Sequence, residues 1–315
     1  MSENTIKKTR VMREVCYEEV ASLRDRMSQY LPHSAAICGI LDTKLHHPSV
    51  KELSTTVYIP ESPWPSSLVV ATPGCSSDLL KSLTVFWSQQ EESDEDLALL
   101  LASLPSCRWN EPLFFYGCPI YVLRKLESLL NCECLASGQT IMHRISEGLM
   151  YSLCREDLQQ YQLPEGFTVG SLRAEDIDTL QSWWKYNWSE SALALASLLS
   201  HLPSIAVFKE AGEGDAGGGD RRLVSWIHHY KNGSMGNTFT LPEYRRLGLA
   251  RCATLALAYK NIESGRRAYV FIDEVNTDSI LFHEKTGFKK QCGIGWNVSL
   301  PRGVALEDVI PVRND

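Results

Sequence analysis

The pattern of hydrophobic and polar positions predicts alternating helices and strands along the first half of the chain. Apolar residues at helical spacing predict a helix over 14–30. Short runs of small and β-branched residues predict two strands, at 35–43 and 67–73, and residues 140–153 are also consistent with a strand. Residues 94–101 and 112–130 combine a strand with a following helix. This alternation favours an α/β or α+β fold.

A second patterned half follows a polar stretch at 159–166, which holds a proline and a glycine. We therefore expect two domains, at 1–162 and 163–315. The pattern of the second half predicts a strand at 167–172, then a helix at 173–184 and a helix at 189–202 capped by Ser189. It then predicts strands at 204–210 and 222–230. The Gly-rich segment 210–222 is expected to join the last two strands as a hairpin loop.

The most informative junction lies where a strand at 234–240 leads into a helix of about sixteen residues that begins near Gly248. The first turn of a helix has N–H groups without an intrahelical acceptor, and the helix dipole places positive charge there. Small residues let phosphates approach the backbone, and arginines add fixed charge. The residues with these properties are Arg245, Arg246, Gly248, Ala250 and Arg251. This cluster predicts a site for a diphosphate-bearing ligand.

Composition narrows the class of protein. The 315 residues include 44% hydrophobic and 22% charged residues, which suits two globular domains. The formal net charge of −7 argues against a nucleic-acid binder, and no apolar run is long enough for a membrane span. The acidic residues near the N-terminus argue against a transit peptide, so we expect a cytoplasmic protein, with a mitochondrial location as the alternative. The ten cysteines are scattered without a C-x-x-C pair, so we expect thiols and no metal site.

Two motifs in the same half resemble the GNAT superfamily of acyl-CoA N-acyltransferases. The first is Arg-x-x-Gly-x-Ala at 245–250, and the second follows a strand at 268–275 and consists of Asn276, Ser279, His283, Gly287 and Phe288. Four segments resemble the glycine N-acyltransferase family more closely, namely 31–43, 64–73, 240–250 and 295–300.

The resemblance implies two tandem GNAT-like domains, each a twisted mixed sheet flanked by helices. It places acyl-CoA, as co-substrate, in the C-terminal domain. The N-terminal half lacks the Arg-x-x-Gly-x-Ala motif, so one CoA site is expected. The residues implied to hold CoA are Phe239, Thr240, Leu241, Arg245, Arg246, Leu247, Gly248, Leu249, Ala250, Arg251, Asn276 and Ser279. Asn276 is alternatively the cap of a helix at 277–285.

The implied reaction is direct attack of an amine, from glycine or another small amine, on the thioester. Competent members of the glycine family have a Glu base where this chain has Ser234, and a serine cannot replace it. The candidate substitutes are His228, His229 and Glu243, and strand alternation places only one of the two histidines on a given face. His283 stands where many superfamily members have a Tyr that protonates the leaving thiolate. An ordinary structural role remains the alternative for each of these four residues.

Two other functions stay open. The same chemistry can serve a peptide or protein amine, and Ser234 is also consistent with a CoA-binding relative that does no catalysis. An aromatic cluster formed by Trp183, Trp184, Tyr186 and Trp188 belongs either to the core or to the wall of an acceptor site. We expect a monomer.

Overall fold

The two halves of the chain contain the same elements in the same order. The computed structural model describes residues 11–50, 53–61, 67–73, 80–89, 93–105, 107–131, 135, 140–210 and 221–310. The first half consists of β1 (Met12–Glu14), α1 (Tyr17–Met27), α2 (Ala35–His46), β2 (Thr55–Pro60), β3 (Val69–Pro73), β4 (Lys81–Phe86), α3 (Asp94–Ala102), β5 (Leu113–Pro119), α4 (Ile120–Asn131) and β6 (Thr140–Leu153). The second consists of β7 (Phe167–Gly170), α5 (Ile177–Trp183), α6 (Ala192–His201), β8 (Ser204–Lys209), β9 (Arg222–His229), β10 (Met235–Thr240), α7 (Leu249–Glu263), β11 (Ala268–Asp273), α8 (Thr277–Lys285) and β12 (Lys289–Pro301).

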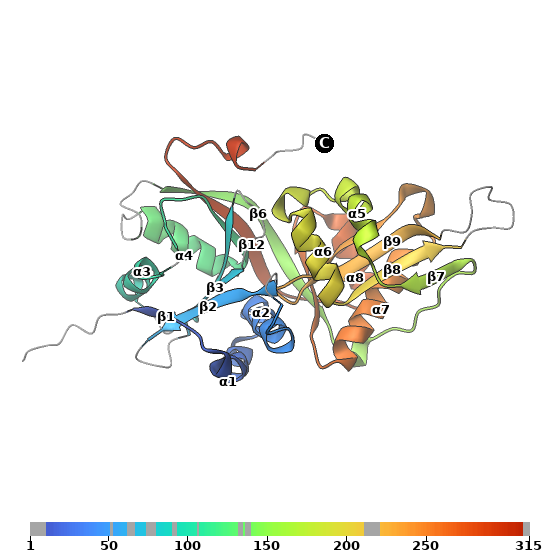
Figure 1. Ribbon diagram of the computed structural model, residues 1–315, viewed down its shortest axis with the longest axis horizontal. Coiled ribbons are helices and arrows are strands. Elements are labelled where there is room, and N and C mark those ends of the chain that lie inside the picture. Colours follow the sequence, from blue (N-terminus) through green and yellow to red (C-terminus); the bar gives the residue numbers. More distant parts are fainter. Residues whose placement is uncertain are drawn as a thin grey trace, which may run out of the picture.

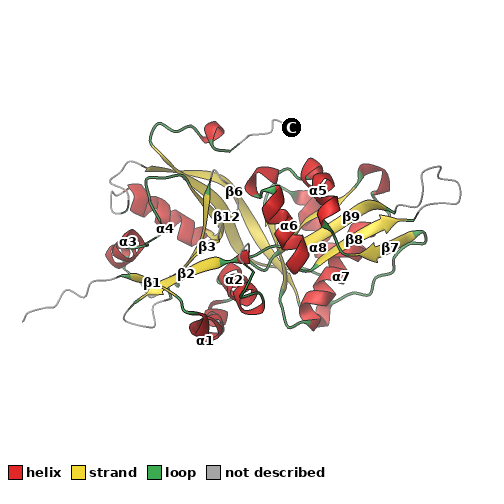
Figure 2. Cartoon of the chain, in the orientation of Figure 1, coloured by secondary structure: helices red, strands yellow, loops and turns green. Residues whose placement is uncertain are grey.

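Within the described residues, one 12-stranded sheet runs through both halves (Figures 1 and 2). The strand order is β1-β2-β3-β4-β5-β12-β6-β11-β10-β9-β8-β7. The halves exchange their last strands, because β12 pairs with β5 and β6 pairs with β11. All neighbours are antiparallel except β4–β5 and β10–β11, the corresponding pairs of the two halves. The boundary expected between 162 and 163 falls between β6 and β7 and stays a prediction.

Helices cover both faces of the first half's strands. Neighbouring residues on β3 point to opposite faces, so Val69 joins the core under α1 and α2, while Val70 joins the core under α3 and α4. In the second half, α5, α6 and α7 pack against strands β8 to β11 in one large core. None of the described helices is long and apolar enough to cross a membrane.

The strand predicted at 35–43 is wrong, since these residues form helix α2. A short apolar run does not distinguish a buried strand from a buried helix. Every residue from 35 to 41 is buried, because α2 packs against α1 on one side and the second half on the other. A Cβ at Gly39 would lie 1.9 Å from the carbonyl oxygen of Asn232, so the glycine is required by this close packing.

The other predicted helices and strands are confirmed within a few residues, with one change at a helix start. Helix α6 begins after Ser191, whose hydroxyl accepts from the N–H of Ala194, and Ser189 is not the cap. Residues 211–220 of the predicted hairpin loop lie outside the described residues, although β8 and β9 pair as expected. The cysteines within the described residues are free thiols: Cys16, Cys38, Cys107, Cys118, Cys154, Cys252 and Cys292.

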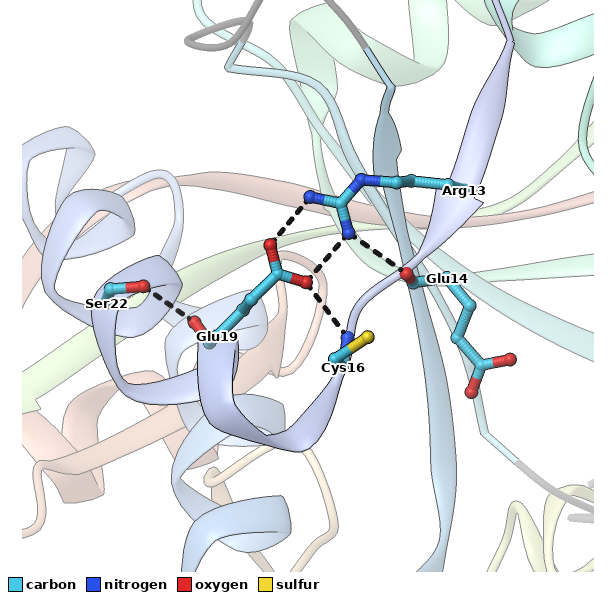
Figure 3. Close-up of polar contacts among 5 residues, drawn as sticks. All are labelled: Arg13, Glu14, Cys16, Glu19 and Ser22. Atoms are coloured by element: carbon cyan, nitrogen blue, oxygen red, sulfur yellow. Dashed lines mark hydrogen bonds and ion pairs between the residues drawn. The ribbon is translucent and has the colours of Figure 1, made fainter.

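An ion pair joins the first strand to the first helix (Figure 3). Arg13 donates two hydrogen bonds to Glu19, at 2.7 and 2.6 Å, and the N–H of Cys16 donates to the same carboxylate at 3.1 Å. These bonds favour the ionised form and lower the pKa of Glu19 from its usual value to about 2. Because about a third of each side chain is exposed, solvent weakens the pair.

We expect Glu19→Gln to lower the free energy of unfolding by about 0.5–1 kcal/mol at neutral pH. Because the folded-state pKa is depressed, the contribution of Glu19 is complete above its usual value of 4.5 and is lost as the pH falls toward about 2. Urea unfolding of both proteins across this range measures the difference. Glu18→Gln, at an exposed neighbouring carboxylate, is the control. A wild-type advantage that persists unchanged at the acid end would contradict the assignment.

Candidate functional site

Strands β10 and β11 are parallel neighbours that pair at a single position. Met235 is in register with Val270, and both strands continue beyond this position without further pairing. On its other edge, β10 shifts register against β9 between Gly236 and Phe239, where Asn237 has a φ of 51°. Such a bulge bends the strand. The bend therefore lies where the two parallel strands stop pairing.

The loop after β10 brings a helix N-terminus to the end of this strand. Residues 245–248 are exposed, and Gly248, the N-cap of α7, has a φ of 82°. Glycine adopts this left-handed conformation at little cost, whereas a residue with a Cβ is strained in it. The N–H groups of the first turn, from Leu249 onward, have no intrahelical acceptor. The predicted helix start is confirmed, and its geometry suits an anion.

The three arginines at this helix start are held differently. The Nε of Arg245 donates to the carbonyl oxygen of Thr240 at 3.2 Å. Arg251 donates to the side-chain oxygen of Gln159 at 2.7 Å, which ties α7 to the segment between the halves. Arg246 is exposed, with a φ of 66°, and no hydrogen bond or ion pair to another described residue holds its side chain. Arg246 is thus the arginine best able to meet an incoming phosphate.

The corresponding helix of the first half has the opposite charge at its N-terminus. Helix α3 is capped by Ser93 and has Asp94, Glu95 and Asp96 in its first turn. Carboxylates at this position satisfy the helix dipole themselves and repel a phosphate. Only one of the two related helix starts therefore suits an anionic ligand.

Comparisons with known proteins agree with this arrangement. Residues 216–296 match the family described as FR47-like protein. A Drosophila protein from a structural genomics consortium is 18% identical and has a TM-score of 0.76, covering 93% of this chain and 100% of its own. A tandem GNAT protein from the clavulanic acid biosynthesis pathway is 13% identical, with a TM-score of 0.56, and covers 94% of this chain and 99% of its own. A search of curated proteins found no match.

The chain has a tandem GNAT fold. A GCN5-related N-acetyltransferase from Sphaerobacter thermophilus, 9% identical, matches it with a TM-score of 0.54 over 96% of this chain and 99% of its own. The predicted fold class is therefore confirmed, and the likeness to the GNAT superfamily is supported by the family match in the second half. The narrower likeness to glycine N-acyltransferases stays a proposal.

The second GNAT motif forms a capped helix. The side-chain oxygen of Asn276 accepts from the N–H of Ser279 at 3.1 Å, so the capping interpretation of Asn276 is confirmed. Contact of these two residues with CoA stays a prediction. Among the other residues predicted to hold CoA, Leu241 and Leu249 are buried and Leu247 is exposed. Because the side chains of Leu241 and Leu249 are buried, their contacts with CoA would use the backbone.

His283 is buried on α8 between the rings of Phe282 and Phe288. Its Nδ1 lies 2.8 Å from the carbonyl oxygen of Ser279, which can only accept, so Nδ1 carries the proton of the neutral ring. Burial lowers the pKa of His283 to about 4. At neutral pH its buried Nε2 has no proton to give to a thiolate. The role of His283 as the acid that protonates the leaving thiolate stays a prediction. This role would require the ring to change its protonation state.

His228 and His229 lie on opposite faces of β9 and are both buried. His228 packs against Tyr230, whereas His229 lines a small cavity beside α2 with Arg266 and Tyr269. Burial lowers the pKa of His228 to about 4, and burial together with the positive charge of Arg266 lowers that of His229 to about 3. Both rings are neutral near pH 7, and either remains a predicted base.

The remaining predicted positions are occupied by structural contacts. Glu243 is exposed and forms an ion pair of 2.7 Å with Arg222. Ser234 is buried, and both its N–H and its hydroxyl donate to the side-chain oxygen of Asn232, at 3.1 and 2.8 Å. The serine thus holds the turn between β9 and β10. Within the described residues, no group of three or more His, Cys, Asp or Glu side chains could hold a metal ion.

The members of the aromatic cluster in the second half have different surroundings. Trp184 is buried, but Trp183 is 46% exposed and packs on Phe239 of β10 with ring centroids 5.2 Å apart. The hydroxyl of Tyr186 donates to Asp273 at the end of β11, at 3.4 Å. A single hydrophobic-core role is therefore wrong for this cluster. Trp183 and Tyr186 thus contact β10 and β11, the two parallel strands that stop pairing.

Sequence reasoning missed Glu190, which lies between the 3-10 turn Asn187–Ser189 and α6. It lines a cavity between the halves together with Tyr116 of β5 and Lys231 of the turn after β9. Burial raises the pKa of Glu190 to about 7, despite the opposing effect of Lys231. The sequence placed this residue in the predicted helix at 189–202, and no local signal separates it from a surface glutamate.

We expect Gly248→Ala to lower the free energy of unfolding by about 1–2 kcal/mol, because an alanine is strained at this φ. An added Cβ would meet no atom within 4 Å, so the cost is conformational. Gly265→Ala is a matched control, since Gly265 also has a positive φ, 75°, and open space around it. Denaturant unfolding should give similar losses. A neutral Gly248→Ala beside a destabilised control would show that the left-handed cap is not kept in solution.

Proposed function

We propose that this protein is an acyl-CoA-dependent N-acyltransferase that transfers an acyl group to a small amine, glycine or another amino acid. One observation carries the proposal. Two parallel strands stop pairing after Met235, and β10 then leads directly to an exposed, glycine-capped helix start beside Arg246. The thioester of acyl-CoA would lie in the space between the two strands, and its pyrophosphate would bind at the helix N-terminus. One extended ligand would reach both places.

The residues fit CoA at this place. The N–H groups from Arg246 to Arg251 and the side chain of Arg246 would bind the phosphates. The backbone of Phe239 to Leu241 would pair with the pantetheine amides. Bound acyl-CoA supplies an activated carbonyl and a thiolate leaving group. The acidic first turn of α3 supports a single CoA site in the chain.

The cavity beside this site suits a small amino acid. Glu190 complements an ammonium group and Lys231 complements a carboxylate, and both line the same cavity. The cavity volume is about 50 Å³. One water molecule needs about 10–15 Å³ when volume is measured in the same way. This size favours a small free amine over the side chain of a protein acceptor.

A non-catalytic CoA-binding protein is the second candidate, and Ser234 favours it. This buried serine holds a turn through its hydrogen bond to Asn232, and a serine hydroxyl does not replace a carboxylate base. The protein would then bind CoA without transferring the acyl group.

We expect the wild type to bind one CoA per chain, and Arg246→Glu to weaken binding by at least about tenfold, because the new carboxylate repels the phosphates. Isothermal titration calorimetry measures both. Arg302→Glu, at an exposed arginine in the turn after β12, should change the Kd by less than about twofold.

Thiol release from acetyl-CoA and benzoyl-CoA, with a panel of amino acids as acceptors, separates the two candidate functions. CoA binding with acceptor-dependent thiol release supports the acyltransferase. Binding without turnover for every pair supports the non-catalytic protein. Absence of binding by the wild type at near-millimolar CoA would refute both.

A further inference from the structure

The segment that carries Glu190 crosses the candidate site and connects the two halves. At one end, Trp183 packs on Phe239 of β10. Tyr186 then bonds to Asp273 of β11. Trp188 reaches the first half, where its ring lies 5.5 Å from that of Phe114. Residues 183–190 therefore pass over both strands of the unpaired region before Glu190 enters the cavity.

The cavity itself adjoins the bend in β10. Tyr230 lines the cavity, and its ring lies so close to Gly236 that a Cβ there would be 2.6 Å from it. Gly236 begins the bulge where β10 leaves its register with β9. The ring of Tyr230 thus contacts both the cavity and the start of the bulge in β10.

The first half supplies the opposite wall. Ser82 and Thr84 of β4, Phe114 and Tyr116 of β5, and Ile40 of α2 line the cavity. Glu190 is half-buried as a residue, but its Oε2 is buried and has no hydrogen-bond partner among the described residues. A buried carboxylate oxygen without a donor is costly, and an amine would provide one.

Three titratable groups face Glu190. Lys231 comes from the turn after β9, Tyr230 from the end of β9, and Tyr116 from β5. Both tyrosines have pKa values raised by burial and are neutral at ordinary pH. The walls from β4 and α2 contribute uncharged residues. Lys231 is therefore the nearby group whose charge controls the protonation of Glu190.

We infer that Glu190 is the general base of this reaction, in place of the glutamate that Ser234 cannot replace, and that the first half completes the acceptor site. This inference rests on the proposed acyltransferase function. It gives the first half, which lacks the Arg-x-x-Gly-x-Ala motif, a direct part in the reaction.

The protons and bonds balance as follows. Glu190 takes one proton from the acceptor ammonium, and the nitrogen lone pair forms a bond to the thioester carbonyl carbon. The C–S bond then breaks with its electron pair on sulfur. The second nitrogen proton passes to the thiolate, which leaves as free CoA. The products are the amide, CoA and one proton that Glu190 returns to solvent.

The decisive variant is Glu190→Gln, which keeps the shape of the side chain and removes its basicity. We expect kcat for thiol release to fall at least about 100-fold, with calorimetric CoA binding unchanged. Glu190→Asp should retain part of the rate. Glu165→Gln, at an exposed glutamate before β7, is the matched control and should leave kcat unchanged.

The pH profile separates catalysis from positioning. Wild-type kcat should rise with pH through about 7, as Glu190 loses its proton. Lys231→Met removes the positive charge that favours ionisation, so this inflection should move to higher pH. In a Glu190→Gln background, the inflection and its displacement by Lys231→Met should both disappear, leaving only the ionisation of the amine.

A stability measurement reads the same carboxyl without any substrate. Because the folded-state pKa of Glu190 is raised, its contribution to stability is complete below the usual pKa of 4.5 and is lost as the pH rises toward about 7. The wild type should lose unfolding free energy over this range relative to Glu190→Gln.

Each outcome bears on a different claim. An active wild type with an equally active Glu190→Gln, or with an unchanged pH profile, refutes the base and leaves the proposed function intact. A wild type that binds CoA without turnover refutes the proposed function and the base with it. An equal pH dependence of stability in wild type and Glu190→Gln would show that the carboxyl is not buried as described, and would also overturn the inference.

Discussion

The pairing of β6 with β12 is the constraint on which the rest of the structure depends. The two strands form an antiparallel ladder from the pair Lys289–Ser152 to the pair Pro301–Thr140. Each strand also pairs with the sheet of the other half. The halves therefore cannot separate without breaking backbone hydrogen bonds in the centre of the sheet, where an unpaired N–H or C=O is costly. The contact of Gly39 with the turn at Asn232 follows from this fixed orientation.

The same element order produces different chemistry in the two halves. In the first, β4 and β5 pair at three successive positions and the following helix begins with three carboxylates. In the second, β10 and β11 pair once, β10 bends at Gly236, and Gly248 opens a helix start next to arginines. The second half thus differs from the first in the bulge of β10 and in the sign of the charges at the helix start. These two differences suit β10 and β11 to a ligand, whereas β4 and β5 line the cavity around Glu190.

Burial decides which ionisable groups are useful near this site. Desolvation disfavours the charged form, so it keeps buried histidines such as His228 and His283 neutral and holds the proton of Glu190 more tightly. A carboxyl whose pKa is near 7 can accept a proton at neutral pH and can also release it. Glu243, which is exposed and paired with Arg222, lacks such an environment.

The sequence alone determined the class of fold, most of the helices and strands, and the helix start at Gly248, because these depend on local periodicity, turn residues and short motifs. It did not predict helix α2, whose apolar residues are buried on all sides by elements from both halves. The exchange of β6 and β12 and the cavity around Glu190 were likewise decided by tertiary structure. Glu190 meets Tyr116 and Lys231 only after the chain has folded, and its raised pKa comes from the exclusion of water at that meeting point. Such properties arise from long-range packing, so no pattern of neighbouring residues encodes them.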